Sequence, residues 1–213
     1  MQSGQQLGWI EVIAGSMYSG KTEELIKRVR RAQFAKQKTQ MFKPALDNRY
    51  HETNVSSHDQ NQMTAIPLKS IHDVWNHLEA DTHVVGFDEG QFLSNDLITI
   101  AKELAARGMR VIIAGLDMDW KGQPFEPIPT LMAIAEDVSK PRAICTVCGN
   151  LASYTQKLRG SSSQIEIGSQ DNYEARCRQH FSPVLIAIAA PEAHMKNSVI
   201  IPKSSFGTDI GLG

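Results

Sequence analysis

The stretch formed by residues 8–22 limits more than any other what this chain of 213 residues can fold into. Residues 9–14 are an apolar run, and residues 15–22 have the spacing G-x-x-x-x-G-K-T. A helical pattern follows at once, so we expect a buried strand, a glycine-rich turn and a helix N-terminus. Backbone N–H groups and the helix dipole in such a turn surround an anion. A chance match is disfavoured by the strand before the turn and the helix after it, so the stretch predicts a phosphate-binding loop.

The residue types of this loop indicate how it would hold phosphates. Gly15 and Gly20 let the backbone curl where a Cβ would intrude. Lys21 brings a point charge to the β- and γ-phosphates, and the Thr22 hydroxyl can hold Mg²⁺. The expected phosphate-binding residues are Gly15, Ser16, Met17, Tyr18, Ser19, Gly20, Lys21 and Thr22. We interpret the basic residues of the following helix as a solvated face in preference to further phosphate contacts: Lys27, Arg28, Arg30, Arg31 and Lys36.

Length and composition favour a single medium domain, alone or with a small appendage. The formal charge of −1 supplies no basic field, so composition does not favour a nucleic-acid partner. Residues 1–6 are polar and lack a signal-type apolar core, and no stretch approaches the roughly 18 apolar residues of a membrane span. We therefore expect a cytoplasmic protein with no membrane partner. Three cysteines are an odd count, which does not suit a disulfide framework.

Apolar runs alternate with helical patterns over the first 140 residues. We expect strands at 38–43, 83–87 and 110–115, a helix capped by Ser70, and a second helix that begins at Ser94 or Asn95 and ends at Gly108. Residues 45–65 are polar and rich in turn formers, and a loop of that length in a compact domain has a function or is mobile. Nearly continuous apolar strands between helices predict an α/β fold with a parallel sheet covered on both faces.

Two adjacent acids, Asp88 and Glu89, follow the apolar run that begins at residue 83. Ligands of open parallel sheets gather outside the carboxyl ends of the strands, where the pattern also places Asp117. An acid in this position can reach the Mg²⁺ that Thr22 also contacts. The other acid can accept a proton from an attacking hydroxyl. A strand that ends in two acids is weak evidence alone, but together with the phosphate-binding loop it predicts a phosphoryl-transfer site.

The chain changes in texture from about residue 140. Cys145-x₂-Cys148 and Cys177-x₂-His180 have the spacing of two metal-binding knuckles, and Zn²⁺ takes a Cys₃His set tetrahedrally. The alternative, a redox CxxC with a stray cysteine, lacks a thioredoxin-like context. We therefore expect a closed, structural zinc site at the base of the loop 149–176. Short strands are expected around 154–155 and 165–167, with a flexible stretch at 160–163, and the apolar run 183–190 is a further strand or an oligomer contact.

Several of these motifs resemble those of the zinc-containing thymidine kinases, the type found in many bacteria and in animal cytosol. The motifs are residues 15–22, 24–31, 87–92 and 114–117 and the four metal ligands, together with Tyr154, Thr155, Gly168 and residues 171–173. They stand in the family's order between about residue 9 and residue 181. The resemblance implies a RecA-like P-loop core, a small zinc-binding lasso domain and a homotetramer.

The resemblance also implies roles for particular residues. Glu89 matches the catalytic base that deprotonates the nucleoside 5′-hydroxyl, and Phe92 matches the aromatic residue stacked on thymine. Three residues match those around the base and its methyl group: Met17, Leu116 and Thr155. Tyr173 and the main chain near Gly168 match the lasso segment that closes over the nucleoside. The expected ATP-binding set is completed by Asp88, Glu89, Gly90 and Gln91, and the expected Mg²⁺ ligands are Thr22 and Asp88.

The chain departs from the family pattern in two places. His180 stands where many members have a fourth cysteine, which preserves zinc but can alter its affinity. The segment after Phe181 has no obvious counterpart. We therefore expect a P-loop domain at 1–140, a zinc-binding lasso domain at 141–181 and a C-terminal extension at 182–213 without an assigned role.

The reaction expected from these features is phosphorylation of thymidine by ATP, with deoxyuridine as a poorer acceptor. One alternative is a kinase on the same core that acts on another nucleoside. A second is a P-loop ATPase whose zinc ribbon grips nucleic acid, which requires clustered Lys and Arg with stacking aromatics on the module. The module instead mixes Lys157, Arg159, Arg176 and Arg178 with Glu166, Asp171 and Glu174, so ATP and thymidine, and no nucleic acid, are the expected partners.

Overall fold

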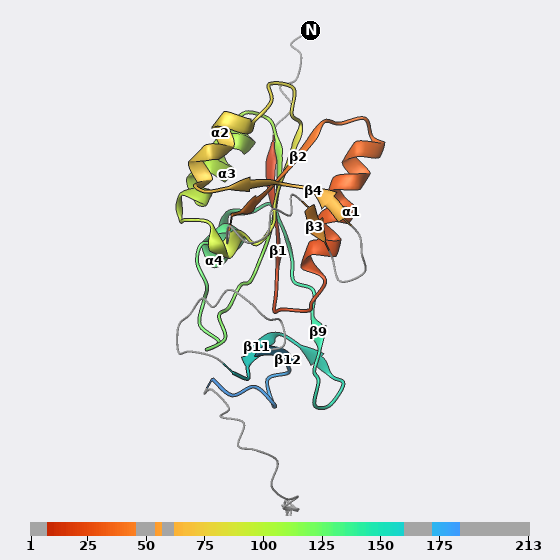
Figure 1. The fold of residues 1–213 in the computed structure, drawn as a ribbon, viewed down its shortest axis with the longest axis vertical. Helices are drawn as coiled ribbons and strands as arrows, with labels where there is room; N and C mark the ends of the chain where they lie inside the picture. The colour runs from red at the N-terminus through yellow and green to blue at the C-terminus, as the bar shows by residue number, and fades with distance from the viewer. Residues whose placement is uncertain (1–7, 46–53, 57–61, 160–171, 184–213) are drawn as a thin grey trace, which may run out of the picture.

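The computed structural model describes residues 8–45, 54–56, 62–159 and 172–183 (Figure 1). Its centre is a six-stranded sheet in the order β5-β2-β6-β7-β1-β8, in which every pairing is parallel. The strands are β1 (Trp9–Ala14), β2 (Thr39–Pro44), β5 (Ile66–Leu68), β6 (Val84–Phe87), β7 (Arg110–Gly115) and β8 (Asp137–Ser139). The α/β class and the parallel sheet predicted from the apolar runs are confirmed.

Helices cover both faces of this sheet (Figure 1). Helix α1 (Lys21–Phe34) lies on one face, and α2 (Val74–His77), α3 (Asp96–Ala106) and α4 (Ile128–Ile134) lie on the other. Alternate strand residues enter the two cores: Ile13 packs in the cluster with α1, whereas Val12 packs in the cluster with α3 and α4. Because side chains of a strand alternate between faces, a strand buried on both faces must be apolar throughout. The covering helices therefore explain the continuous apolar run of residues 9–14.

The region 45–65 is not a single long loop. Strands β3 (Asn54–Ser56) and β4 (Gln62–Thr64) pair antiparallel, and β5 then joins the edge of the main sheet beside β2. Three-residue strands are too short to show alternation in the sequence, which is why the polar composition of this region concealed them. The remaining residues, 46–53 and 57–61, lie outside the described part of the chain.

The helix starts expected at Ser70 and at Ser94 or Asn95 are both present, with differences in detail. The Ser70 hydroxyl accepts a hydrogen bond from the His72 N–H, and the Asp73 carboxylate accepts one from the Ser70 N–H, which forms a capping box. The capped segment is a 3₁₀ turn, Ile71–Asp73, that continues as the single turn of α2. Asn95 precedes α3 without a side-chain capping bond.

Arg28 departs from the solvated-face interpretation of α1. Its guanidinium lies 2.7 Å from Oε2 of Glu11 on β1, 3.0 Å from Oε1 of Glu24 and 3.0 Å from Oδ2 of Asp137 on β8. Glu11 is buried and also pairs with Arg110 on β7. Burial raises the pKa of the Glu11 carboxyl, but hydrogen bonds from Arg110, Trp9 and Arg28 bring it below the usual range. This network anchors α1, and therefore the loop before it, to strands β7, β1 and β8.

A second module follows the sheet. It consists of the antiparallel pairs β9 (Ala143–Ile144) with β10 (Leu151–Ala152), and β11 (Tyr154–Lys157) with β12 (Tyr173–Arg176). It lies beyond the end of the sheet at which β1 passes into α1 (Figure 1). Strand β11 confirms the strand predicted around 154–155, whereas those at 165–167 and 183–190, and the stretch 160–163, lie almost wholly outside the described residues. No helix in the described part is long and apolar enough to cross a membrane.

Candidate functional site

The predicted phosphate-binding loop runs from the end of β1 to the start of α1. Gly20 is the residue before the first helical turn and has φ 81°, a left-handed conformation that glycine adopts without strain. Gly15 has no room for a side chain, because a Cβ there would lie 2.7 Å from the Pro141 carbonyl oxygen. The sequence therefore needs glycine at both ends of the loop for separate reasons, one conformational and one steric.

The loop is closed on itself around one carbonyl group. The Lys21 ammonium donates to the Ser16 carbonyl oxygen at 2.7 Å, and the Ser19 hydroxyl donates to the same oxygen at 2.8 Å. Lys21 is buried, and burial lowers the pKa of its ammonium despite the opposing attraction of Glu89, Asp88 and Asp117. The Ser16 hydroxyl oxygen is buried without a hydrogen-bond partner among the described residues. A buried cation beside an unpaired buried hydroxyl suits a site built to receive an anion.

Asp88, which directly follows β6, contacts the residue at the end of the same loop. Its two carboxylate oxygens both lie 3.2 Å from the Thr22 hydroxyl. Burial and then the adjacent Glu89 carboxylate raise the pKa of Asp88, against the attraction of Lys21, to a net value of about 7. The hydroxyl and carboxylate oxygens together are a ligand set that suits Mg²⁺ in company with phosphate oxygens.

Glu89 occupies a backbone conformation that is unusual for a residue with a side chain. Its φ is 52°, in the left-handed region, and it immediately precedes a 3₁₀ turn, Gly90–Phe92. Its carboxylate accepts a hydrogen bond from the Gln91 amide nitrogen, and the Gln91 amide oxygen accepts one from the Leu116 N–H at 2.9 Å. Left-handed non-glycine residues cost free energy and are concentrated at functional sites.

The second module contacts the loop through two hydrogen bonds. The Met17 N–H donates to the Thr155 hydroxyl at 3.0 Å, and the Tyr18 hydroxyl donates to the Tyr173 carbonyl oxygen at 3.1 Å. Thr155 lies on β11 and Tyr173 on β12. The structure thus brings two of the predicted substrate-binding residues against the phosphate-binding loop. Gly168, predicted for the same segment, lies outside the described residues.

Two aromatic residues after β7 lie against predicted site residues or their module, and they were not predicted from the sequence. The ring of Phe125 meets Phe92 edge to face at a centroid distance of 6.1 Å. Trp120 is buried, and the Lys157 ammonium lies 5.3 Å from its ring centroid and 5.8 Å from that of Tyr173. Both missed aromatics follow the carboxyl end of a parallel strand, the position where ligands of such sheets bind. Their place after the predicted strand 110–115 is the sequence feature that could have identified Trp120 and Phe125.

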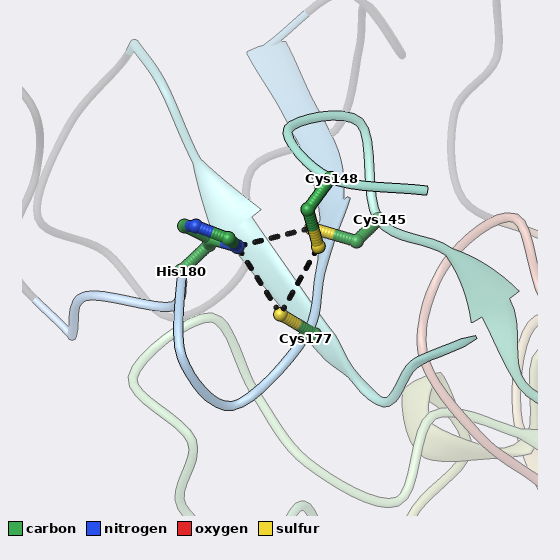
Figure 2. A group of neighbouring side chains, drawn as sticks. All are labelled: Cys145, Cys148, Cys177 and His180. Atoms are coloured by element: carbon green, nitrogen blue, oxygen red, sulfur yellow. Dashed lines mark hydrogen bonds between the residues drawn. The ribbon is translucent and has the colours of Figure 1, made fainter. Parts of the chain in front are cut away.

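The four predicted metal ligands converge in the second module (Figure 2). Their ligand atoms all lie within 4.8 Å of one another. The Cys148 and Cys177 sulfurs are 3.8 Å apart, and the His180 Nδ1 lies 3.8 Å from the Cys145 sulfur and 3.3 Å from that of Cys177. Tetrahedral Zn²⁺ with Zn–S and Zn–N bonds near 2.3 and 2.0 Å separates its ligand atoms by about 3.5–3.8 Å. The cluster is therefore consistent with a zinc site.

The chemistry of the cluster agrees with its geometry. Burial raises the pKa of the Cys145 thiol, but backbone N–H groups of Cys177, Val147 and Cys148 lower it, and the net value is about 6. A thiol of this kind is largely ionised at neutral pH, and the thiolate is the form that binds metal. The four side chains would fill all four positions of a tetrahedral ion and leave none for a substrate, so the cluster suits a structural role.

Comparisons with known proteins agree on one family. The family model described as thymidine kinase matches residues 8–181. A thymidine kinase of Bdellovibrio bacteriovorus is 57% identical over 176 residues, which cover 83% of this chain and 86% of the relative. A thymidine kinase of a Rhodothermus species is 49% identical over 184 residues, which cover 86% of this chain and 85% of the relative.

The raised pKa of Asp88 predicts a stabilising substitution at the site. The folded chain holds this proton up to about pH 7, whereas an ordinary aspartate releases it near 3.8, so the carboxyl group removes stability as the pH rises between these values. Asp88→Asn does not titrate and should stabilise the Mg²⁺-free, nucleotide-free chain. We expect a gain on the order of 1–3 kcal/mol at pH 8 and a smaller gain at pH 5, measured by urea unfolding.

Glu103→Gln is the control, because it makes the same change of charge on an exposed position of α3. Equal gains for Asp88→Asn at pH 5 and pH 8, or a loss at pH 8, would contradict the burial argument.

The cluster also predicts which ligand substitutions the metal tolerates. Elemental analysis after dialysis against a chelator should find about one zinc per chain. Cys177→Ser should lower that value below half, because a hydroxyl is a poor zinc ligand. His180→Cys should retain it, since four thiolates also bind zinc tetrahedrally. Gln179→Ala, an exposed position in the same turn, is the matched control. Full zinc content in Cys177→Ser would show that this residue is not a ligand.

Proposed function

Because the chain belongs to the thymidine kinase family, we propose that it transfers the γ-phosphate of ATP to the 5′-hydroxyl of thymidine, in nucleotide salvage for DNA synthesis. One observation supports the proposal above others: Lys21, Thr22, Asp88 and Glu89 approach one another at the carboxyl edge of the sheet. That grouping joins the parts that phosphoryl transfer needs, a cation and metal ligands for the phosphates and a carboxylate for the acceptor.

On the donor side, the loop residues 15–22 and the segment 88–91 receive ATP. The Lys21 ammonium leaves the Ser16 carbonyl oxygen and pairs with the phosphates, where its buried position makes the attraction strong. Thr22 and Asp88 hold Mg²⁺, and their oxygens already face each other. When bound with ATP, this ion neutralises charge that develops on the phosphates during transfer.

On the acceptor side, Glu89 takes the proton from the thymidine 5′-hydroxyl. Phe92 stacks on thymine, as the family resemblance implies, and its edge-to-face contact with Phe125 fixes the ring plane. Met17, Leu116 and Thr155 surround the base, and Tyr173 and Gly168 belong to the segment that closes over the nucleoside. The hydrogen bonds from Met17 to Thr155 and from Tyr18 to Tyr173 support a site shared between the two modules.

The four-residue cluster holds structural zinc in this proposal and fixes the base of the segment that carries Tyr173. We divide the chain accordingly into a P-loop domain up to about residue 140, a zinc-binding lasso domain at 141–181 and an extension from 182. A homotetrameric assembly in the cytoplasm is proposed on the family resemblance alone.

Substrate choice tests the function as a whole. A lasso that reads thymine with main-chain groups leaves buried groups unpaired against cytosine, and each such group costs about 1–3 kcal/mol. Deoxyuridine lacks only the methyl group, which is worth about 1–3 kcal/mol in an apolar pocket. Across a panel assayed by ADP release, kcat/KM should fall from thymidine to deoxyuridine, and deoxycytidine and purine nucleosides should be far behind. Comparable values for thymidine and deoxycytidine would return the chain to the wider class of nucleoside kinases.

The proposed base has its own test. Glu89→Gln keeps the size of the side chain but cannot accept the proton, so kcat should fall by about 10²–10⁴-fold while thymidine binding is retained. Glu103→Gln on the exposed face of α3 is the control for the change of charge. A loss of less than about tenfold at unchanged KM would exclude Glu89 as the base.

A further inference from the structure

We propose that Gln91 is a positioning residue, which holds the Glu89 carboxylate at a fixed place relative to the nucleoside pocket. The family resemblance groups Gln91 with the ATP-binding residues, but both ends of its side-chain amide are engaged elsewhere. The inference rests on the proposed function, because it assigns Gln91 a role through Glu89.

The two hydrogen bonds of the amide fix its orientation. The Leu116 main-chain N–H can only donate, so it requires the amide oxygen of Gln91 at the observed distance of 2.9 Å. The amide nitrogen is thereby directed to the Glu89 carboxylate, which accepts from it. Reversal of the amide would set donor against donor at one end and oxygen against oxygen at the other. The link therefore has one stable arrangement.

Packing holds the link in place as firmly as its hydrogen bonds. Gln91 is only 3% exposed, so a partner lost from either end of the amide would not be replaced freely by water. Its amide oxygen fits because residue 115 is glycine: a Cβ there would lie 2.9 Å from that oxygen and 2.5 Å from Cδ1 of Ile128. The carboxyl end of β7 is thus shaped to admit this side chain.

Charge explains why Glu89 needs such a link. Two charged groups that act on its carboxylate are the Lys21 ammonium from α1, which attracts it, and the Asp88 carboxylate from the end of β6, which repels it. Asp117, after β7, acts on the same lysine. Attraction alone would draw the carboxylate toward Lys21 and the donor phosphates. The amide of Gln91 restrains it, so that it remains available to the acceptor hydroxyl.

The other end of the link belongs to the nucleoside pocket. Leu116 matches a residue beside the thymine methyl group, and its N–H is the donor to Gln91. The pocket wall and the base are therefore parts of one hydrogen-bonded unit. A misplacement of about 1 Å between reacting groups can cost 10²-fold in rate, so the link should appear in kcat more than in binding.

The test replaces Gln91 in the full-length chain. Gln91→Met keeps the length of the side chain without its hydrogen bonds, and Gln91→Glu can still accept from the Leu116 N–H but no longer donates to Glu89. We expect both to lower kcat by about 10–100-fold, with KM for ATP and the Kd for thymidine within about threefold of wild type. Gln40→Met is the matched control, because Gln40 is a buried glutamine of β2 whose amide bonds lie around His77, Glu79 and Thr82, on elements that contribute no residue to the proposed site.

A double substitution separates positioning from other roles. Gln91→Met added to Glu89→Gln should cost less than about threefold more in kcat, because the residue acts through a base that is already lost. Multiplied effects would overturn the proposal. So would a raised KM for ATP at unchanged kcat, which is the behaviour of a donor ligand, or a loss of kcat no larger than that of Gln40→Met. If Glu89→Gln itself were fully active, the assignment of the base would fail and the positioning role with it. A wild-type chain inactive on thymidine would instead refute the proposed function.

Discussion

The parallel pairing of β1, β7 and β6 is the constraint on which the candidate site depends. Ala14 at the end of β1 pairs with Gly115 at the end of β7. Phe87 at the end of β6 pairs with Ile113, which is two residues before the end of β7. The three strands therefore stop at nearly the same level, and whatever follows each of them meets at one edge. The phosphate-binding loop follows β1, two acids follow β6 and an aromatic-rich loop follows β7, which explains how Thr22 and Asp88, 66 positions apart, come within hydrogen-bond distance.

Burial at this edge gives the charged groups properties that they would lack in water. Lys21 and Asp88 are both buried, and burial disfavours the charged form of each, so the pKa of the lysine is lowered and that of the aspartate is raised. The free protein thus carries groups that are only partly satisfied by one another. Under the proposed function, a polyanionic ligand with its metal would pair with these groups.

The sequence predicted the core well because its signals are local. The run 9–14, the spacing of Gly15, Gly20 and Lys21, and the CxxC–CxxH pair each follow from the chemistry of neighbouring residues. What it could not predict depends on contacts between distant segments. The sequence does not distinguish Arg28 from the exposed cations of its helix, because its partner Asp137 lies on the distant strand β8. The strands within 45–65 are too short to show an alternating pattern. Trp120 and Phe125 were missed because their contacts with Lys157 and Phe92 depend on how the loop after β7 folds back.

The contact with Thr155 engages the Met17 amide of the phosphate-binding loop. Its N–H is already committed to the second module rather than to an incoming phosphate. Backbone amides exchange their hydrogen with solvent only when such a bond opens. Deuterium uptake at this single residue would therefore report how often the second module leaves the loop, and could be compared between the free chain and the chain with either proposed substrate.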